Sequence, residues 1–114
     1  MRYEEIYLDK ARKLRFDFNA IADLEQKAGV GIGALLSEEK VGFNTLRLLL
    51  WSGLKWEDRK LTSEQAGDLM QDFVENGGDL TYISVLITKA LEKSGMLGKQ
   101  GDEEKNVETE AATN

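Results

Sequence analysis

One segment, from Arg47 to Thr62, constrains the fold of this chain most, and it reads RLLLWSGLKWEDRKLT. Its first ten residues contain four leucines and two tryptophans, and the four residues that follow are all charged. We expect a helix from about Gly42 to Trp56 whose apolar residues spread over nearly all of its circumference. Such a helix is buried on several sides, either as the central helix of a small protein or as one that gives a face to a partner.

Two sets of apolar residues divide the surface of this expected helix between them. The first recurs at helical spacing and is expected to form the main buried stripe: Phe43, Leu46, Leu50 and Leu54. The second spreads around much of the remaining circumference: Leu48, Leu49 and Trp51.

The N-terminal part of the chain carries two strand patterns, YEEIYL at residues 3–8 and RKLRFDF at residues 12–18. In the second segment Leu14, Phe16 and Phe18 alternate with polar residues. Because side chains alternate across a strand, we expect these three on one face. A short loop formed by Asp9, Lys10 and Ala11 would join the two strands as a hairpin.

The ends of the other helices are marked by capping residues. Asn19 is a candidate N-cap for a first helix that ends at Gly29, and residues 31–36 are expected to form one short helical turn. Thr62 followed by Gln65 is a capping-box pattern for the fourth helix. The remaining caps are Gly77 and Gly78 at the end of that helix, then Asp79 at the start and Gly95 at the end of a fifth.

The 114 residues fit one domain, and this fold is expected to occupy residues 1–97. It is mainly α, a small bundle of about four helices with an N-terminal β-hairpin at about residues 3–18. Residues 98–114 contain five acidic residues, two lysines and a single valine, which predicts a disordered acidic tail.

The apolar face of the fourth helix comprises Ala66, Leu69, Met70, Phe73 and Val74.

The composition excludes several functional classes. The chain has no Cys and no His, which removes thiolate chemistry, the commonest general base and the commonest metal ligands. The formal net charge is −6, so neither the body nor the tail is suited to a nucleic-acid backbone, and a helix-turn-helix interpretation of the last two helices lacks the necessary cations. No apolar run is long enough for a membrane span or a signal peptide, which predicts a soluble, intracellular protein.

The carboxylates Asp68, Asp72 and Glu75 are the only candidates for chemistry, because they fall at i, i+4 and i+7 on one side of the fourth helix. Carboxylates in this arrangement can hold a divalent cation or act as acid and base. The simpler interpretation is a solvated acidic face opposite the apolar one. We therefore predict no catalytic, cofactor-binding or metal-binding residue and no enzymatic activity, and a metal-dependent enzyme is the remote alternative.

The order of features resembles the tail assembly chaperones of long-tailed, non-contractile bacteriophages and related prophages. Residues 14–29, LRFDFNAIADLEQKAG, place a strand with an F-N-A step before a helix that has L-E near its middle. Residues 46–70, LRLLLWSGLKWEDRKLTSEQAGDLM, combine an L-L-W-x-G-L helix, a charged E-D loop and an L-T-x-E-x-x-G-x-L-M segment. The final amphipathic helix and the short charged tail complete the match.

The resemblance implies a non-enzymatic role in phage morphogenesis. Such chaperones bind the long, helical tape measure protein, keep it soluble, help to recruit tail tube protein, and are absent from the mature virion. The expected location is the host bacterial cytoplasm, and self-association is a further expectation. Many members also exist as a longer form made by a ribosomal frameshift, and the acidic tail would be where the two forms diverge.

A chaperone for an amphipathic helix needs an apolar groove or face. We predict that six residues supply it: Leu48, Leu49, Trp51, Trp56, Leu86 and Ile87. Trp is enriched in interface hot spots, and Trp56 beside the charged loop is the more exposed candidate of the two tryptophans. Each of these residues has core packing as its alternative. For the whole chain, the alternative is a generic helical interaction or adaptor module with no phage role.

Overall fold

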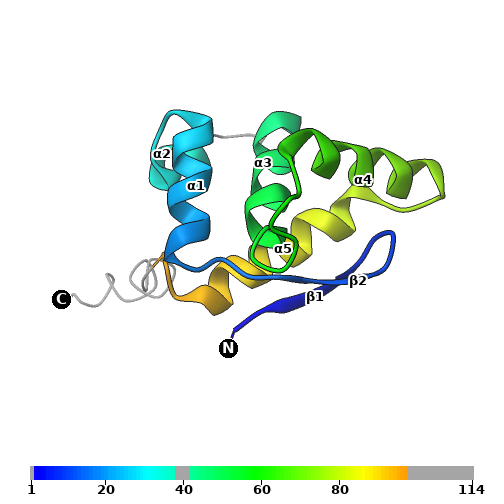
Figure 1. The fold of residues 1–114 in the computed structure, drawn as a ribbon, viewed down its shortest axis with the longest axis horizontal. Helices are drawn as coiled ribbons and strands as arrows, with labels where there is room; N and C mark the ends of the chain where they lie inside the picture. The colour runs from blue at the N-terminus through cyan, green and yellow to red at the C-terminus, as the bar shows by residue number, and fades with distance from the viewer. Residues whose placement is uncertain (1, 38–41, 98–114) are drawn as a thin grey trace, which may run out of the picture.

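The computed structural model describes residues 2–37 and 42–97. Within these residues, an antiparallel pair of strands precedes five helices (Figure 1). The elements are β1 (Glu4–Tyr7), β2 (Ala11–Leu14), α1 (Phe18–Ala28), α2 (Ile32–Leu36), α3 (Phe43–Leu54), α4 (Ser63–Glu75) and α5 (Leu80–Ser94). The predicted class, a mainly helical domain with about four substantial helices and an N-terminal hairpin, is confirmed. The predicted acidic tail lies outside the described residues.

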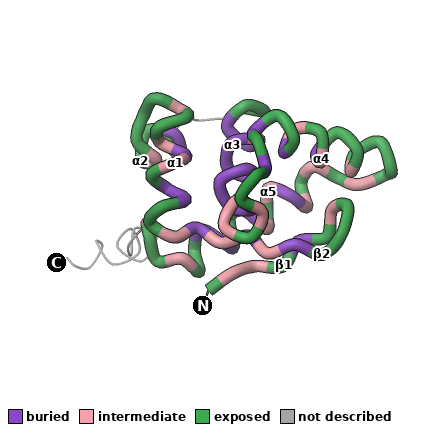
Figure 2. Tube along the Cα trace, in the orientation of Figure 1, coloured by how far each residue is buried: buried purple, intermediate pink, exposed green. Residues whose placement is uncertain are grey.

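Helix α3 is the centre of the fold. It packs against α1, α4, α5 and β2, and it is buried along most of its length (Figure 2). Its buried residues form an almost continuous run from Thr45 to Leu54, interrupted only at Arg47. Of the two roles left open for this helix, the structure shows that of the central helix.

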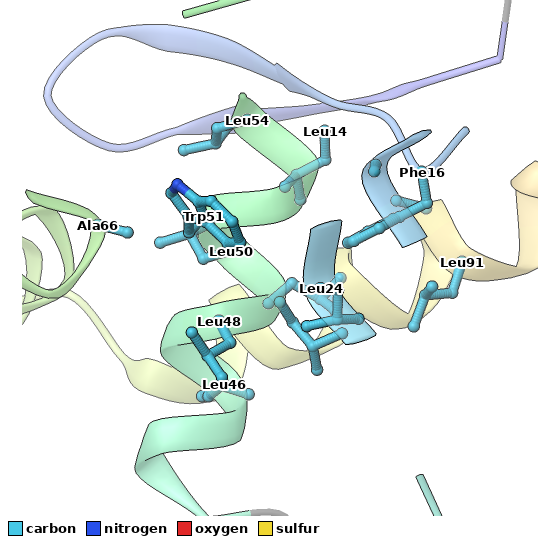
Figure 3. Packing of buried hydrophobic residues seen from close by; sticks show 14 of the residues in the cluster. Leu14, Phe16, Leu24, Leu46, Leu48, Leu50, Trp51, Leu54, Ala66 and Leu91 are labelled. Atoms are coloured by element: carbon cyan, nitrogen blue, oxygen red, sulfur yellow. The ribbon is translucent and has the colours of Figure 1, made fainter. Parts of the chain in front are cut away.

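Side chains from the hairpin and from the surrounding helices pack against α3 in one hydrophobic core (Figure 3). Leu14 and Phe16 enter from the hairpin and the segment that follows it, and Leu24 enters from α1. Ala66 on α4 and Leu91 on α5 close the core from other sides. Burial of these apolar groups is the main source of stability for a domain of this size.

The hairpin is held against the helices along both of its outer edges. On the β2 side, the Arg15 N–H donates to the Gly53 carbonyl oxygen at 2.9 Å, and Trp56 Nε1 donates to the Lys13 carbonyl oxygen at 2.9 Å. On the β1 side, the Tyr7 N–H donates to the Tyr82 hydroxyl of α5 at 3.0 Å. Exposed strand edges invite non-native pairing, and these contacts protect part of both.

Most of the predicted helix caps are confirmed. Thr62 and Gln65 form the reciprocal capping box of α4. The Asp79 carboxylate accepts from the Thr81 N–H at the start of α5, and Gly95 ends that helix in the left-handed conformation, with φ of 72°. These caps were predictable because each depends on groups within three residues of one another.

The predicted N-cap of the first helix was wrong. Asp17, not Asn19, caps α1, and its carboxylate accepts from the Ala20 N–H at 2.8 Å. The helix therefore begins at Phe18, which leaves the alternation of the preceding strand and is 76% exposed. Leu14 and Phe16 are buried as predicted, but the third member of that predicted face is not.

Phe43 was also wrongly assigned to the buried stripe of α3. It is the first residue of that helix and is 78% exposed, whereas Leu46, Leu50 and Leu54 are buried as predicted. Side chains on an α-helix lean toward its N-terminus. A residue in the first position therefore projects beyond the helix end instead of onto the core.

Candidate functional site

Four of the six residues predicted to bind a partner lie in the core. Leu48, Leu49, Trp51 and Ile87 are each at most 7% exposed. Trp51 Nε1 donates to the Leu61 carbonyl oxygen at 2.9 Å, so the polar end of the indole is also satisfied internally. In this conformation the four residues stabilise the fold and are not presented to a partner.

Trp56 is half-buried, as expected for the more exposed of the two tryptophans. Its ring lies under the Arg15 guanidinium, with the guanidinium carbon 5.5 Å from the ring centroid, a cation–π arrangement. It lines a small cleft of about 140 Å³ between the start of α1 and the end of α3, which the Lys55–Asp23 ion pair borders at 2.9 Å. This cleft is too small for a helix.

Leu86 is half-buried on α5 and packs against the edge of the core. The six predicted residues are therefore divided between the core, the Trp56 cleft and the edge of α5. They do not form one exposed face, and their role in partner binding stays a prediction.

A larger depression lies elsewhere, along α4. One hollow of about 500 Å³ is bounded by the hairpin turn at Leu8 and Asp9 and by α4 at Leu69 and Phe73. A second, of about 390 Å³, adjoins it at Leu69 and extends toward Gln65. We call the two together the α4 groove. Figure 1 shows the hairpin turn reaching toward the end of α4 that leads into α5.

The helical period explains which side of α4 faces the groove. Ala66 and Met70 are buried against the core, and α4 packs chiefly on α3. Leu69 and Phe73 follow three positions later in each case, so they lie on an adjacent strip of the helix and are only half-buried. The apolar face of α4 is thus wider than the surface that α3 covers.

The Phe73 end of the groove has a defined shape. The Phe73 ring stacks on Tyr82 of α5, with a centroid distance of 5.5 Å and an interplanar angle of 22°. A Cβ built on Gly78 would lie within van der Waals overlap of the Phe73 ring. The absence of a side chain at Gly78 therefore lets the chain turn closely around this ring. Phe73 is held in place, which favours a preformed apolar wall over a flexible one.

The hairpin side of the groove is fixed by a charged cluster. Arg12 is buried, and its Nε and Nη2 donate to the two carboxylate oxygens of Asp9 at 2.7 and 2.9 Å. Its Nη1 also donates to Asp58 at 3.3 Å. The hydrogen bond from Arg12 is the largest cause of the lowered pKa of Asp9. Because Arg12 binds both Asp9 and Asp58, it links the hairpin turn to the α3–α4 connection.

The opposite rim carries carboxylates that are not neutralised. Asp68 and Asp72 are exposed on α4, and neither takes part in an ion pair within the described residues. Glu75 is exposed too and accepts a hydrogen bond from Gln71 at 2.7 Å. In residues 2–37 and 42–97, no three acidic side chains come together as a candidate metal site. The three carboxylates occupy the solvated face that the sequence favours.

The sequence reasoning missed the groove. It placed Leu69 and Phe73 on the apolar face of α4 but did not predict that part of this face is left uncovered. The available signal was the width of that face, whose five apolar residues exceed what one neighbouring helix covers. Nothing in the sequence marked Leu8 as a groove residue, because it lines the groove only through the position of the hairpin turn in the folded protein.

Comparison of the chain with protein-family models, with curated proteins and with solved structures found no match in any of the three. In the part of the chain that the structure describes, no helix has the length and apolar character needed to cross a membrane.

Proposed function

We propose that this chain is a non-enzymatic tail assembly chaperone of a long-tailed, non-contractile phage or prophage. In this role it binds the tape measure protein in the host bacterial cytoplasm, helps tail tube protein to assemble, and is absent from the mature virion. A longer, frameshifted form is part of the same proposal. The resemblance of residues 14–29 and 46–70 to that family is the sequence support.

The α4 groove is the structural observation that carries the proposal. A chaperone for a long amphipathic helix must offer an apolar surface along which a helix can lie. The groove has such a surface at Leu8, Leu69 and Phe73, and its hollows fall within the usual size range of binding sites. The large hydrophobic residues of the core contribute indirectly, because they hold the groove walls in position.

Co-expression with the long helical protein encoded beside this chain tests the proposal. We expect the partner to be soluble only when this chain is present, and the two to co-purify. Leu69→Asp, which places a charge on the groove wall, should abolish both effects. Val74→Asp is the matched control, because Val74 is a half-exposed aliphatic residue of α4 that does not line the groove.

A partner that is soluble alone and never co-purifies would contradict the chaperone proposal. Equal loss of binding in Leu69→Asp and Val74→Asp would contradict the placement of the site. Genomic neighbours separate the phage role from a generic adaptor role, since the proposal expects a tube protein gene on one side and a very long helical gene on the other.

A further inference from the structure

We propose that the α4 groove selects a basic amphipathic helix of about three turns. The inference rests on the proposed function in one respect, that the partner is helical. It adds the length, the apolar face and the charge of the segment that binds.

The length follows from the extent of the groove along α4. Its lining runs from Gln65 to Asn76, which at 1.5 Å per residue is about 17 Å. A helix lying along this strip makes contact over about three turns. Longer partners would extend beyond the groove at one or both ends.

The apolar wall of the groove determines which pattern of apolar residues a partner helix needs. Leu69 and Phe73 are one turn apart on α4, and Leu8 faces them from the hairpin turn. Apolar residues at i, i+3 or i+4, and i+7 of a partner helix match a wall with this spacing. The stacking of Phe73 on Tyr82 keeps the wall in place before the partner arrives.

The charged residues at the rim of the groove determine which charge a partner helix should carry beside its apolar face. The groove lining contains four carboxylates against two cations. The guanidinium of Arg12 is already engaged by Asp9 and Asp58, which leaves Lys60 as the remaining cation. Asp68 and Asp72, one helical turn apart, make no ion pair within the described residues. Lys or Arg side chains flanking the apolar face of a partner would complement them.

Charge also argues against two other occupants. A second copy of the chain brings a formal charge of −6 to an already acidic rim. Residues 98–114 carry five acids and two lysines, so their charge has the wrong sign as well. Like charges brought together at an interface oppose binding.

Fluorescence anisotropy with two labelled synthetic peptides tests the inference on the full chain. Both are about 16 residues long, enough for some helix to form, and share the same leucine face. One carries Lys on its flanks and the other carries Glu. We expect the Lys peptide to bind about tenfold or more tightly than the Glu peptide, because attraction is replaced by repulsion. Raising NaCl from about 50 mM to about 500 mM should reduce this difference by screening.

Three variants locate the contact. Asp72→Asn should weaken binding of the Lys peptide by about two- to fivefold, as expected for an exposed charge contact. Glu92→Gln is the matched control, since Glu92 is an exposed carboxylate of α5 outside the groove, and it should bind the Lys peptide as the unaltered chain does. Leu69→Ala should weaken the binding of both peptides about tenfold or more, because Leu69 supplies a central apolar contact of the groove. Circular dichroism confirms that each variant is folded.

Equal affinity for the two peptides, or no binding of either, would overturn the inference. So would a dimer of the chain that Leu69→Ala dissociates, because a second copy would then occupy the groove. The failure of the proposed function has a different signature. If the Lys peptide binds as expected but the neighbouring helical protein does not co-purify, the groove chemistry stands and the phage role falls.

Discussion

Gly53 is the position where a single methyl group should disturb the fold most clearly. It lies near the end of α3, and its carbonyl oxygen accepts the Arg15 N–H that fixes the β2 edge. A Cβ built on Gly53 would lie 2.8 Å from Leu14 Cδ2 and 2.9 Å from Phe16 Cζ. Both neighbours are buried, at 0% and 2% exposed, so neither can move into solvent.

The magnitude for Gly53→Ala follows from two opposing effects. Alanine is favoured over glycine in a helix by about 1 kcal/mol. Inserting a methyl group into a well-packed core costs typically about 1–3 kcal/mol. With two contacts below 3.0 Å, we place the cost at the upper end and expect a net loss of about 1–2 kcal/mol. For a domain of this size, that corresponds to a fall in Tm of about 4–16 °C.

Gly33→Ala is the matched control for this prediction. Gly33 also lies in a helix, α2, but a Cβ built on it meets nothing within 4 Å. The same substitution should therefore be neutral or stabilise the protein by up to about 1 kcal/mol. Urea unfolding of both variants, followed by circular dichroism, gives the two free energies. If Gly53→Ala is as stable as the unaltered chain, the packing of α3 against the hairpin is not as close as we argue.

Four further substitutions test other contacts. Thr62→Ala removes the capping box of α4 and should lower the free energy of unfolding by about 1 kcal/mol in urea titrations. Trp51→Phe leaves the buried Leu61 carbonyl without its indole donor and should lower the free energy of unfolding by about 1–3 kcal/mol in the same assay. Trp56→Phe removes the donor to the Lys13 carbonyl at a half-buried site and should lower it by less. The lowered pKa of Asp9 makes its carboxylate stabilise the fold above the ordinary pKa of Asp, and this contribution is lost as pH falls through the lowered value. Asp9→Asn should flatten that acidic part of a plot of the urea midpoint against pH.

The features that were predictable from the sequence are those decided by neighbouring residues. The Thr62–Gln65 capping box and the glycine ends of α1 and α5 depend on groups within a turn of the helix. For α3 the sequence left two roles open, the central helix or one that gives a face to a partner, because a helix with apolar residues nearly all round must be covered on several sides. The contacts of α3 with α1, α4, α5 and β2 decide for the central position.

The errors at helix starts have a common cause. The alternation that ends at Phe18 and the helical stripe that begins at Phe43 were each extended by one residue past a boundary. At such a boundary the period changes, and the residue there belongs to the new element. Asp17 was the better N-cap because its carboxylate reaches the Ala20 N–H from an extended backbone. Residue type alone does not decide between two capping residues that lie two positions apart.

The groove shows a limit of the periodicity argument itself. Helical spacing identifies which side of α4 is apolar, but the depth of burial depends on which elements pack there. Ala66 and Met70 meet α3, whereas Leu69 and Phe73 face the gap between α4 and the hairpin turn. Contacts between residues distant in sequence hold that turn, among them the hydrogen bonds from Arg12 to Asp58 and from the Tyr7 N–H to Tyr82. The proposal of a docking surface on α4 therefore depends on two features that periodicity alone does not give. The apolar face of α4 is wider than the surface that α3 covers, and Asp68 and Asp72 beside it make no ion pair within residues 2–37 and 42–97.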